Sequence, residues 1–267
     1  MNGHSFEVNG KSYNSNFKIL SENLLFFNRT HTRKGIVSEI DAFPNMWTLA
    51  FANVDPDKVG VWRQGQKIRV EGPWAVFIPP FSMVKWHLMP GTLVWDAFLS
   101  FAPLPLNLQE KAFVFPWNGK DKPNNLKEII NLLENAEGRI DITNENVFNT
   151  TAFKTKKIID RTFMDHNFSI ALVAEELGVT HAFVSRSFKK SYGISPVTYR
   201  NRMRVFESSK LMLFGGHNVT SAGHEVGFLD SARFHKQFRS EMNAVPSEFC
   251  VEKKKNRNEL IAERVNY

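Results

Sequence analysis

The last hundred residues of this chain contain an internal duplication, which restricts their fold more than any other feature of the sequence. Residues 169–178 (SIALVAEELG) align with residues 218–227 (NVTSAGHEVG) at an offset of 49, and both segments end in glycine. Beyond this glycine the offset becomes 50, which pairs Phe188 with Phe238. Because a sequence repeat is one structural unit used more than once, we expect both copies to fold in the same way.

Each copy predicts two short helices joined by a tight turn. Gly178 and Gly227 end the first helices, because glycine adopts a positive φ at the least cost. The small residues Ala174 and Gly223 allow one helix to approach another closely. The remaining predicted features are N-caps at Ser169, Thr180, Asn218 and Asp230, and second helices at about 181–191 and 231–242. Each copy is therefore predicted to be a helix-turn-helix motif.

A longer helix is predicted between the two copies. Ser195 caps it, Pro196 takes its first position, and Gly215 and Gly216 follow its end. About nineteen residues at ~1.5 Å each make a rod of roughly 28 Å. Adjacent major grooves on one side of B-DNA lie ~34 Å apart. Such a rod can hold two recognition helices in consecutive grooves.

The positive charge of the chain is concentrated on this duplicated region. The 267 residues carry a formal net charge of +7. Residues 178–255 contain 13 Lys and Arg against 6 Asp and Glu, so they hold the entire excess. A local excess of this kind is what a phosphate-contacting surface requires.

These segments resemble the DNA-binding domain of the AraC/XylS family of bacterial transcription regulators. The resemblance is carried by residues 173–179 (VAEELGV), 184–190 (VSRSFKK), 192–196 (YGISP), 225–239 (EVGFLDSARFHKQFR) and 246–249 (PSEF). It implies a cytoplasmic activator or repressor that binds specific double-stranded DNA and acts on RNA polymerase at promoters. It also implies an N-terminal cupin-like barrel, with a small-molecule effector and a homodimer as further expectations.

The exposed faces of the second helices hold the candidate DNA contacts. Arg186 and Arg233 are the strongest candidates for direct readout, because Arg pairs bidentately with guanine; a plain phosphate contact is an equal alternative for each. We interpret Phe183, Val184 and Phe188 as packing residues. The base-contact candidates are His181, Ala182, Ser185, Arg186, Ser231, Ala232, Arg233, His235 and Lys236, and the phosphate-contact candidates are Lys189, Lys190 and Arg239.

Two positions depart from the family pattern. Ala222-Gly223 stands where the family usually has Ile-Ala, which removes core volume and places a glycine inside a helix at a cost of ~1 kcal/mol. Asn243 replaces the usual glycine before the final motif. We therefore expect the second copy to be less stable than the first.

The first half of the chain has a different pattern. All six tryptophans lie in the first 117 residues, among short apolar segments that partly alternate with period two and are broken by Pro79-Pro80 and Pro90-Gly91. This pattern predicts an antiparallel barrel or sandwich. The predicted fold class is thus α+β and multidomain: an N-terminal barrel, an amphipathic connector helix and a C-terminal all-α domain. The predicted divisions are 1–118, 119–150, 151–252 and a basic tail at 253–267.

Two features of this part of the chain each allow two interpretations. Four tryptophans either fill the barrel core or partly line an apolar effector pocket; they are Trp47, Trp74, Trp86 and Trp95. Apolar residues at helical spacing either pack on their own domain or form a dimer seam; they are Leu126, Ile129, Ile130 and Leu133.

Several classes of protein are disfavoured by the sequence. His4, His31 and His87 are the only histidines of the first half and form no His-x-His pair, so we expect no metal and no cofactor. We expect no enzyme activity; the alternative is a metal-free cupin-like enzyme with an accessory DNA-binding domain. The single cysteine, Cys250, fits a reducing cytoplasm. No apolar run approaches the ~20 residues of a membrane span, and no export signal is recognised at the start of the chain.

Overall fold

The computed structural model describes most of the chain. The described residues are 2–8, 11–42, 46–52, 59–63, 66–68, 73–109, 111–118, 121–142, 150–242 and 245–250. The chain divides into two compact units, and each is treated by itself below. The N-terminal unit contains residues 1–144, and the helical unit contains residues 145–253. Asn243 and the tail at 253–267 lie outside the described residues.

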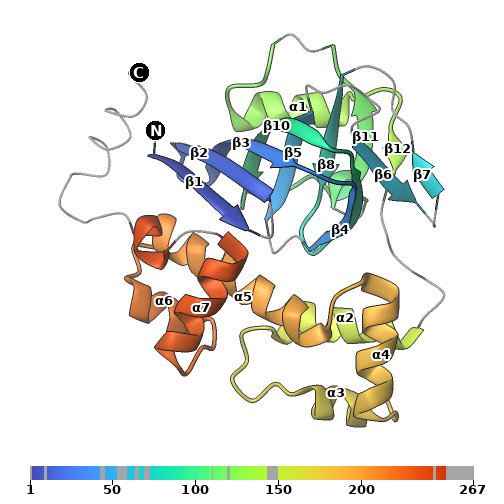
Figure 1. Cartoon of the computed structure of the whole chain (residues 1–267), viewed down its shortest axis with the longest axis vertical. Helices are drawn as coiled ribbons and strands as arrows, with labels where there is room; N and C mark the ends of the chain where they lie inside the picture. Colours follow the sequence, from blue (N-terminus) through green and yellow to red (C-terminus); the bar gives the residue numbers. More distant parts are fainter. Residues whose placement is uncertain are drawn as a thin grey trace. The chain divides into compact units, whose positions relative to one another are not determined.

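The N-terminal unit contains two antiparallel sheets (Figure 1). The larger sheet has the strand order β1 (Asn2–Val8), β2 (Lys11–Ser21), β3 (Leu24–Arg33), β10 (Gly91–Ser100), β5 (Trp47–Ala52), β8 (Trp74–Ile78), β11 (Phe113–Pro116) and β12 (Ile140–Asp141). The smaller sheet has the order β4 (Val37–Ala42), β9 (Met83–Leu88), β6 (Val59–Arg63) and β7 (Gln66–Ile68). A short 3-10 helix, η1, spans Leu106–Leu108.

The expectation of a closed barrel is not met, because these strands form two sheets. The ladder of the larger sheet ends at β1 on one side and at β12 on the other. Among the described residues, no hydrogen-bonded ladder joins either of these strands to the smaller sheet. The antiparallel, strand-rich character of this half is confirmed, while the closed barrel is corrected to two sheets.

The central strands β5 and β8 of the larger sheet are buried on both faces, because alternate residues of a strand point to opposite faces. In β8, Trp74 and Val76 join one hydrophobic cluster, whereas Ala75 and Phe77 join another. The first cluster is shared with the smaller sheet, to which β9 contributes Trp86. The second cluster is shared with a helix. A central strand with two buried faces is apolar at every position, as the five buried residues of β8 are.

The helix on the second face is α1 (Leu126–Glu134), which contains the four apolar residues given two interpretations above. Asn125 caps it by accepting a hydrogen bond of 3.0 Å from the backbone N–H of Glu128. Ile129 and Leu133 are fully buried in the cluster of the larger sheet. These two residues therefore belong to the core of their own unit and are not available for a dimer seam. Leu126 and Ile130 are partly buried in the same cluster.

The helical unit follows the duplicated sequence. Its elements are α2 (Thr150–Thr162), α3 (Ile170–Glu176), α4 (His181–Tyr192), α5 (Pro196–Leu213), α6 (Val219–Glu225), α7 (Ser231–Met242) and η2 (Pro246–Phe249). Helices α3 and α4 form the first helix-turn-helix motif, and α6 and α7 form the second. The long helix α5 runs between them (Figure 1). None of the helices in the described part of the chain combines the length and apolarity needed to cross a bilayer.

Side-chain caps begin these helices as the sequence predicts. Ser169 accepts from the N–H of Leu172 at 3.2 Å, and Asn218 accepts from the N–H of Ser221 at 2.8 Å. The corresponding contacts of the second helices are Thr180 with the N–H of Phe183 at 3.2 Å and Asp230 with the N–H of Ala232 at 2.8 Å. Ser195 caps α5 through the N–H of Thr198 at 3.0 Å. The predicted caps are therefore confirmed.

Each motif has its own hydrophobic core. The core of the first motif contains residues of α2, α3 and α4, namely Ile158, Ile170, Val173, Ala174 and Val184. The core of the second motif contains residues of α5, α6, α7 and η2, together with Phe228 of the turn, namely Val205, Met212, Ala222, Val226, Phe228, Phe234, Phe238 and Phe249. Helix α5 thus connects two separately packed motifs.

Candidate nucleic-acid interface

Helix α4 presents a polar and basic face to solvent. Its buried face is formed by Val184, Ser187, Phe188, Ser191 and Tyr192, which recur at helical spacing. The opposite face is exposed and contains His181, Ala182, Phe183, Arg186, Lys189 and Lys190, while Ser185 is half-buried. The structure therefore places every candidate DNA contact of the first motif outside its core.

Phe183 corrects one of our assignments. We interpreted it as a packing residue, but its side chain is 43% exposed. Its neighbour Val184 is fully buried, and so is Phe188. Because successive residues of a helix are about 100° apart around its axis, two buried residues at i+1 and i+5 turn residue i away from the core.

Helix α7 repeats this arrangement. Phe234 and Phe238 are its buried anchors, with rings 5.6 Å apart. Ser231, Ala232, Arg233, Lys236 and Arg239 are exposed, and His235 is half-buried with its ring edge-on to Phe234. The candidates of the second motif therefore also lie outside its core. Contact with DNA remains a prediction for both helices.

The turn of the second motif is closely packed. Gly227 has φ +93°, and a Cβ built on it would lie 2.6 Å from the carbonyl oxygen of Met164 and 2.5 Å from Nη2 of Arg204. Gly178, in the turn of the first motif, has φ +64° and no atom within 4 Å of such a Cβ. Both turns require glycine for backbone conformation, but only the second also requires it for space.

A small residue is also required inside α6. A Cβ built on Gly223 would lie 2.8 Å from Cδ1 of Phe234. The predicted close approach of helices at this position is confirmed. The glycine that departs from the family pattern is thus matched to the aromatic ring that packs on it, which corrects its interpretation as a simple loss of core volume.

Two arginines of α5 bind backbone carbonyls outside their own helix, and Arg204 connects the two motifs; sequence reasoning missed both. Arg204 is buried, and its guanidinium donates to the carbonyl oxygens of Phe163 at 2.6 Å, Gly227 at 2.9 Å and Asp165 at 3.1 Å. Arg200 donates to the same carbonyls of Phe163 and Asp165. One guanidinium therefore joins α5, the α2–α3 loop and the turn of the second motif. The five fixed donors of Arg suit such a set of acceptors.

The electrostatics of these arginines extend to the second recognition helix. The pKa of Arg200 and that of Arg204 are both lowered to about 10, mainly by burial. The positive charge of Arg233 contributes to both decreases and that of Arg200 contributes to the decrease at Arg204, whereas the carboxylate of Asp165 opposes them. Arg233 therefore lies within electrostatic reach of two other guanidinium groups. These three positive charges, at Arg200, Arg204 and Arg233, favour an anion near the first turn of α7.

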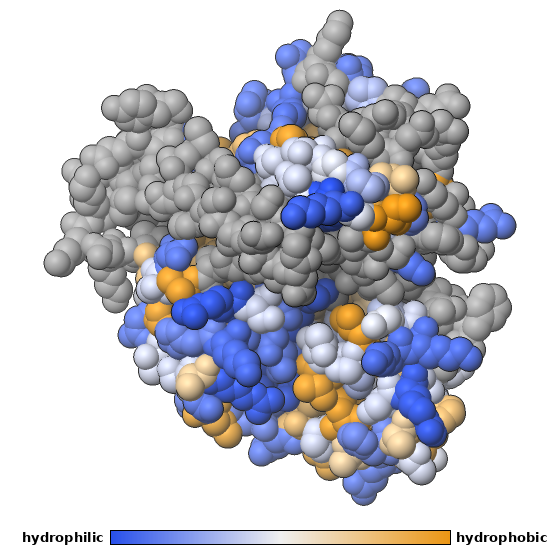
Figure 2. Space-filling model, in the orientation of Figure 1, coloured by the Kyte–Doolittle hydropathy of each residue, from blue (hydrophilic) through white to orange (hydrophobic). Residues whose placement is uncertain are grey.

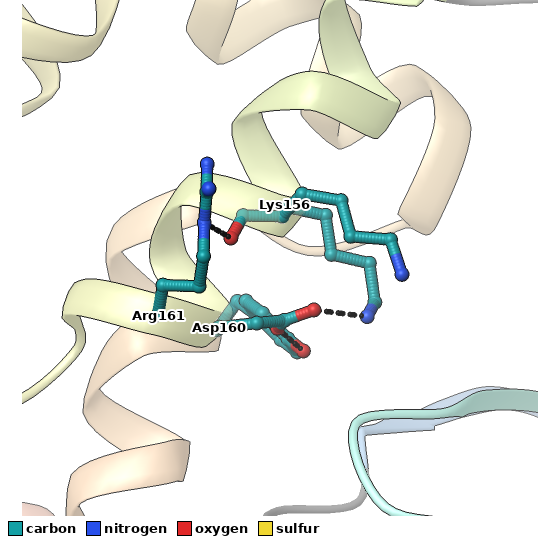
Figure 3. Close-up of polar contacts among 5 residues, drawn as sticks. Lys156, Asp160 and Arg161 are labelled. Carbon is teal, nitrogen blue, oxygen red and sulfur yellow. Dashed lines mark hydrogen bonds and ion pairs between the residues drawn. The ribbon is translucent and has the colours of Figure 1, made fainter. Parts of the chain in front are cut away.

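The long helix is also fixed to α2 by buried polar groups. Nζ of Lys156 lies 2.8 Å from Oδ2 of Asp160, and both side chains are buried (Figure 3). The hydroxyl of Tyr199 in α5 donates to Oδ1 of the same carboxylate. Burial raises the pKa of Asp160, and these two partners oppose that increase. Helices α2 and α5 are therefore held together by a hydrogen bond to a buried ion pair as well as by apolar contacts.

The visible surface of the helical unit is mostly hydrophilic, with smaller hydrophobic patches between the hydrophilic areas (Figure 2). Among the described residues of this unit, the large hydrophobic residues that are exposed are Met164, Leu172, Phe183, Val197 and Leu229. Among these residues, Phe183 is on a recognition helix.

Comparisons with known proteins point to one family for the helical unit. A family model described as a helix-turn-helix domain matches residues 173–250. The arabinose operon regulatory protein of Escherichia coli (strain K12) is 33% identical over 92 residues, which are 33% of this chain and 32% of that protein. The HTH-type transcriptional activator RhaS of Salmonella arizonae is 34% identical over 74 residues, 28% of this chain and 27% of that protein.

The helical unit matches a helix-turn-helix domain and is similar to the DNA-binding domains of the AraC/XylS family, so we call it the AraC/XylS-type domain. The matching segment spans about a third or less of the length of these curated relatives. Among solved structures, ToxT from Vibrio cholerae has a TM-score of 0.46 and 12% identity, and covers 89% of this chain and 97% of that chain. The C-terminal domain of AraT from Geobacillus stearothermophilus has a TM-score of 0.37 and 20% identity, and covers 40% of this chain and 93% of that chain.

The tryptophans outside this AraC/XylS-type domain do not form one group. Trp74, Trp86 and Trp95 share the cluster between the two sheets, with Trp95 edge-on to each of the others at ring distances of 5.8 and 5.4 Å. Trp47 lies in the cluster on the other face of the larger sheet, where its Nε1 donates to the carbonyl oxygen of Ala102 at 2.9 Å. A single pocket lined by all four is therefore corrected to a cluster of three.

Among the described residues, no group of three or more His, Cys, Asp and Glu side chains is arranged so that it could hold a metal ion. His166 and His224 face each other in the AraC/XylS-type domain, with ring centroids 5.4 Å apart. His87 is half-buried in β9, while the side chains of His4 and His31 lie outside the described part.

Proposed function

We propose that this protein is a sequence-specific DNA-binding transcription regulator. The observation that supports it best is the pair of recognition helices, α4 and α7, which present exposed faces containing Arg186 and Arg233. The 18 residues of α5 give a rod of roughly 27 Å between the motifs. This length is close to the ~34 Å repeat of B-DNA. The two matched relatives are regulators by their printed names, so we propose regulation rather than catalysis.

The test is selection of duplexes by the purified full chain. A random-sequence duplex pool is passed over the protein, retained fragments are sequenced, and the selected duplex is titrated by fluorescence anisotropy at several salt concentrations. A steep fall of affinity with salt and a preference of at least a thousandfold over unrelated duplex are expected. Retention of no sequence above the starting pool would refute the proposal.

A matched pair of variants separates the two kinds of contact. Lys189→Ala removes an exposed cation of α4 that we assign to phosphate, so binding should weaken equally on all duplexes and the salt slope should decrease by about 1. Arg186→Ala lies on the same face but should also relax one base position. Identical behaviour of the two variants would assign Arg186 to phosphate.

We further propose that the N-terminal unit controls the AraC/XylS-type domain. Its two sheets would correspond to the cupin-like barrel of the family, and a small apolar effector would bind beside Trp74, Trp86 and Trp95. Because these rings contact one another, an effector there should change tryptophan fluorescence and raise the melting temperature. A panel of sugars and apolar acids, screened for both signals, tests this role. Absence of both signals across the panel would favour contact with protein instead.

Partners beyond DNA follow from the same proposal. A role at promoters places the protein in the cytoplasm and makes RNA polymerase its partner. We propose a homodimer through surfaces of the N-terminal unit other than Ile129 and Leu133, which its own core occupies. Sedimentation at micromolar concentration, with and without selected duplex, measures this association. A monomer under both conditions would contradict it.

A further inference from the structure

The two recognition helices bury residues at equivalent positions, and this determines the direction in which Phe183 points. At the offset of 50, Val184 corresponds to Phe234 and Phe188 corresponds to Phe238. All four are buried to 1% exposure or less. Because these anchors fix the rotation of each helix about its axis, the residue before the first anchor has the same direction in both motifs. Those residues are Phe183 in α4 and Arg233 in α7.

The equivalent positions carry opposite chemistry on otherwise similar faces. Phe183 and Arg233 are both exposed and both occupy the third position of their helix. The neighbouring exposed positions are similar, since both helices have Ala at the second position and a basic residue at the sixth, Arg186 and Lys236. At this equivalent position, the first motif therefore has an aromatic ring and the second motif has a guanidinium group.

The location of Phe183 favours a nucleic acid over an apolar protein partner. Its backbone N–H is held by Thr180, so it lies in the first turn of α4. The N-terminal residues of a recognition helix are those that reach base edges in the major groove. Arg186 lies one turn further along the same face, because residues three apart are neighbours on a helix. The exposed Phe183 therefore shares its face of α4 with the basic residues Arg186 and Lys190.

We propose that Phe183 is a specificity-determining residue that contacts a thymine methyl group in the major groove. The inference rests on the proposed function and adds to it the base that the first motif reads at this point. The 5-methyl group of thymine is the one apolar group that base pairs display in the major groove, and Phe is among the side chains that contact it. At the matched point of the second motif, Arg233 would instead read guanine or phosphate.

The test uses thymine and deoxyuridine, which differ only in that methyl group. In the duplex selected by the wild-type chain, each thymine is replaced in turn by deoxyuridine and affinity is measured. At one thymine, wild-type affinity should fall about fourfold, as expected for exposing one methyl-sized group. Phe183→Ala should bind the parental duplex about as weakly as wild type binds the deoxyuridine duplex, and should not distinguish the two bases there.

Two further variants complete the experiment. Phe183→Arg copies the second motif, so a new selection should replace thymine by guanine at that base pair. Leu106→Ala is the matched control, because Leu106 is an exposed apolar residue of the other unit and should leave every affinity unchanged. Thermal unfolding of all variants checks that the chain remains folded, as expected for exposed positions.

The failures of the two proposals can be told apart. If the wild-type chain selects no sequence, the proposed function fails and this inference fails with it. If it selects a sequence but Phe183→Ala still distinguishes thymine from deoxyuridine at every position, only this inference is overturned. Wild-type affinity of Phe183→Ala for all duplexes would assign the ring to a protein partner and also overturn it.

Discussion

The hydroxyl of Tyr199 donates a hydrogen bond of 2.5 Å to Oδ1 of Asp160, across 39 residues of sequence. Tyr199 is fully buried in α5, and Asp160 belongs to α2. This bond and the ion pair with Lys156 satisfy the buried carboxylate from two sides. The first motif is therefore supported by a polar contact between α2 and α5. Asp160, one of its two residues, lies outside the duplicated sequence.

Tyr199→Phe should destabilise the AraC/XylS-type domain by about 1–3 kcal/mol, because it leaves a buried carboxylate with one partner fewer. Urea unfolding of the full chain, followed by helical circular dichroism, measures the change. Arg161→Ala serves as the control, because it removes an exposed side chain of α2, next to Asp160 in the sequence; the Nε of Arg161 donates to the carbonyl of Lys157 (Figure 3). Equal stability of Tyr199→Phe and wild type would mean that the bond contributes nothing.

Gly227→Ala should destabilise the domain more than Gly178→Ala. Both substitutions place a Cβ on a backbone with positive φ, which costs about 1–2 kcal/mol. At Gly227 the new Cβ would also meet Arg204 and the carbonyl of Met164, so the close contact adds a cost of overpacking of about 1–3 kcal/mol. The difference between the two unfolding free energies isolates that contact. Equal costs would refute it.

Gly223→Ala should destabilise the second motif although alanine is the better helix former. The gain in helix propensity is about 1 kcal/mol. The added Cβ would lie 2.8 Å from the ring of Phe234, and forcing that ring aside should cost more than the gain. A rise in melting temperature would contradict the prediction. In the double variant with Phe234→Leu, the smaller side chain should recover part of the loss due to the alanine.

Arg186→Ala should weaken specific binding by about 1–3 kcal/mol while leaving the stability of the fold unchanged, because the side chain is exposed. Anisotropy titrations against the selected duplex and its single-base variants measure the effect. Relaxed preference at one base pair is the expected result. Uniform weakening on all duplexes would identify a phosphate contact.

Cys250 should react more slowly with thiol reagents than a free cysteine near pH 8. Partial burial raises the pKa of its thiol, and a hydrogen bond from the backbone at Val219 only partly offsets this. A raised pKa leaves less thiolate at a given pH, and the thiolate is the nucleophile. The rate of reaction with a disulfide dye should therefore rise at a higher pH than that of glutathione. A midpoint at or below the glutathione value would contradict the direction of the shift.

The motifs could be predicted from local sequence patterns. The contacts between residues distant in the sequence could not. The caps at Ser169 and Asn218 lie three residues before their donors, so sequence spacing alone reveals them. By contrast, Arg204 binds carbonyls of Phe163 and Gly227, 41 and 23 residues away, and backbone acceptors leave no side-chain signal. The one available sign was an arginine at a position that the helical pattern makes buried.

The N-terminal sheet was predictable only where its strands are apolar. Strand β8 consists of five buried apolar residues and is recognisable as a strand from its composition. Strand β2 is rich in Asn, Ser and Lys, and β1 has only two large apolar residues, Phe6 and Val8, so neither hydrophobic alternation nor composition separates them from a loop. The prediction of a closed barrel was wrong for a related reason. Strand pairing is a long-range property, and an alternation of period two indicates strands without indicating which strands pair.

The separate hydrophobic cores of the two motifs have a consequence for how such a protein changes over time. The apolar contacts of α3 with α4 lie in a different core from the rings beneath α7, so each can be repacked separately while the contacts of Arg204 still link the two motifs. The residues at the matched interior positions, Ala174 and Gly223, have already diverged, and Gly223 fits the ring of Phe234. Duplication followed by separate packing lets the exposed residues of one copy change while the core of the other copy stays the same.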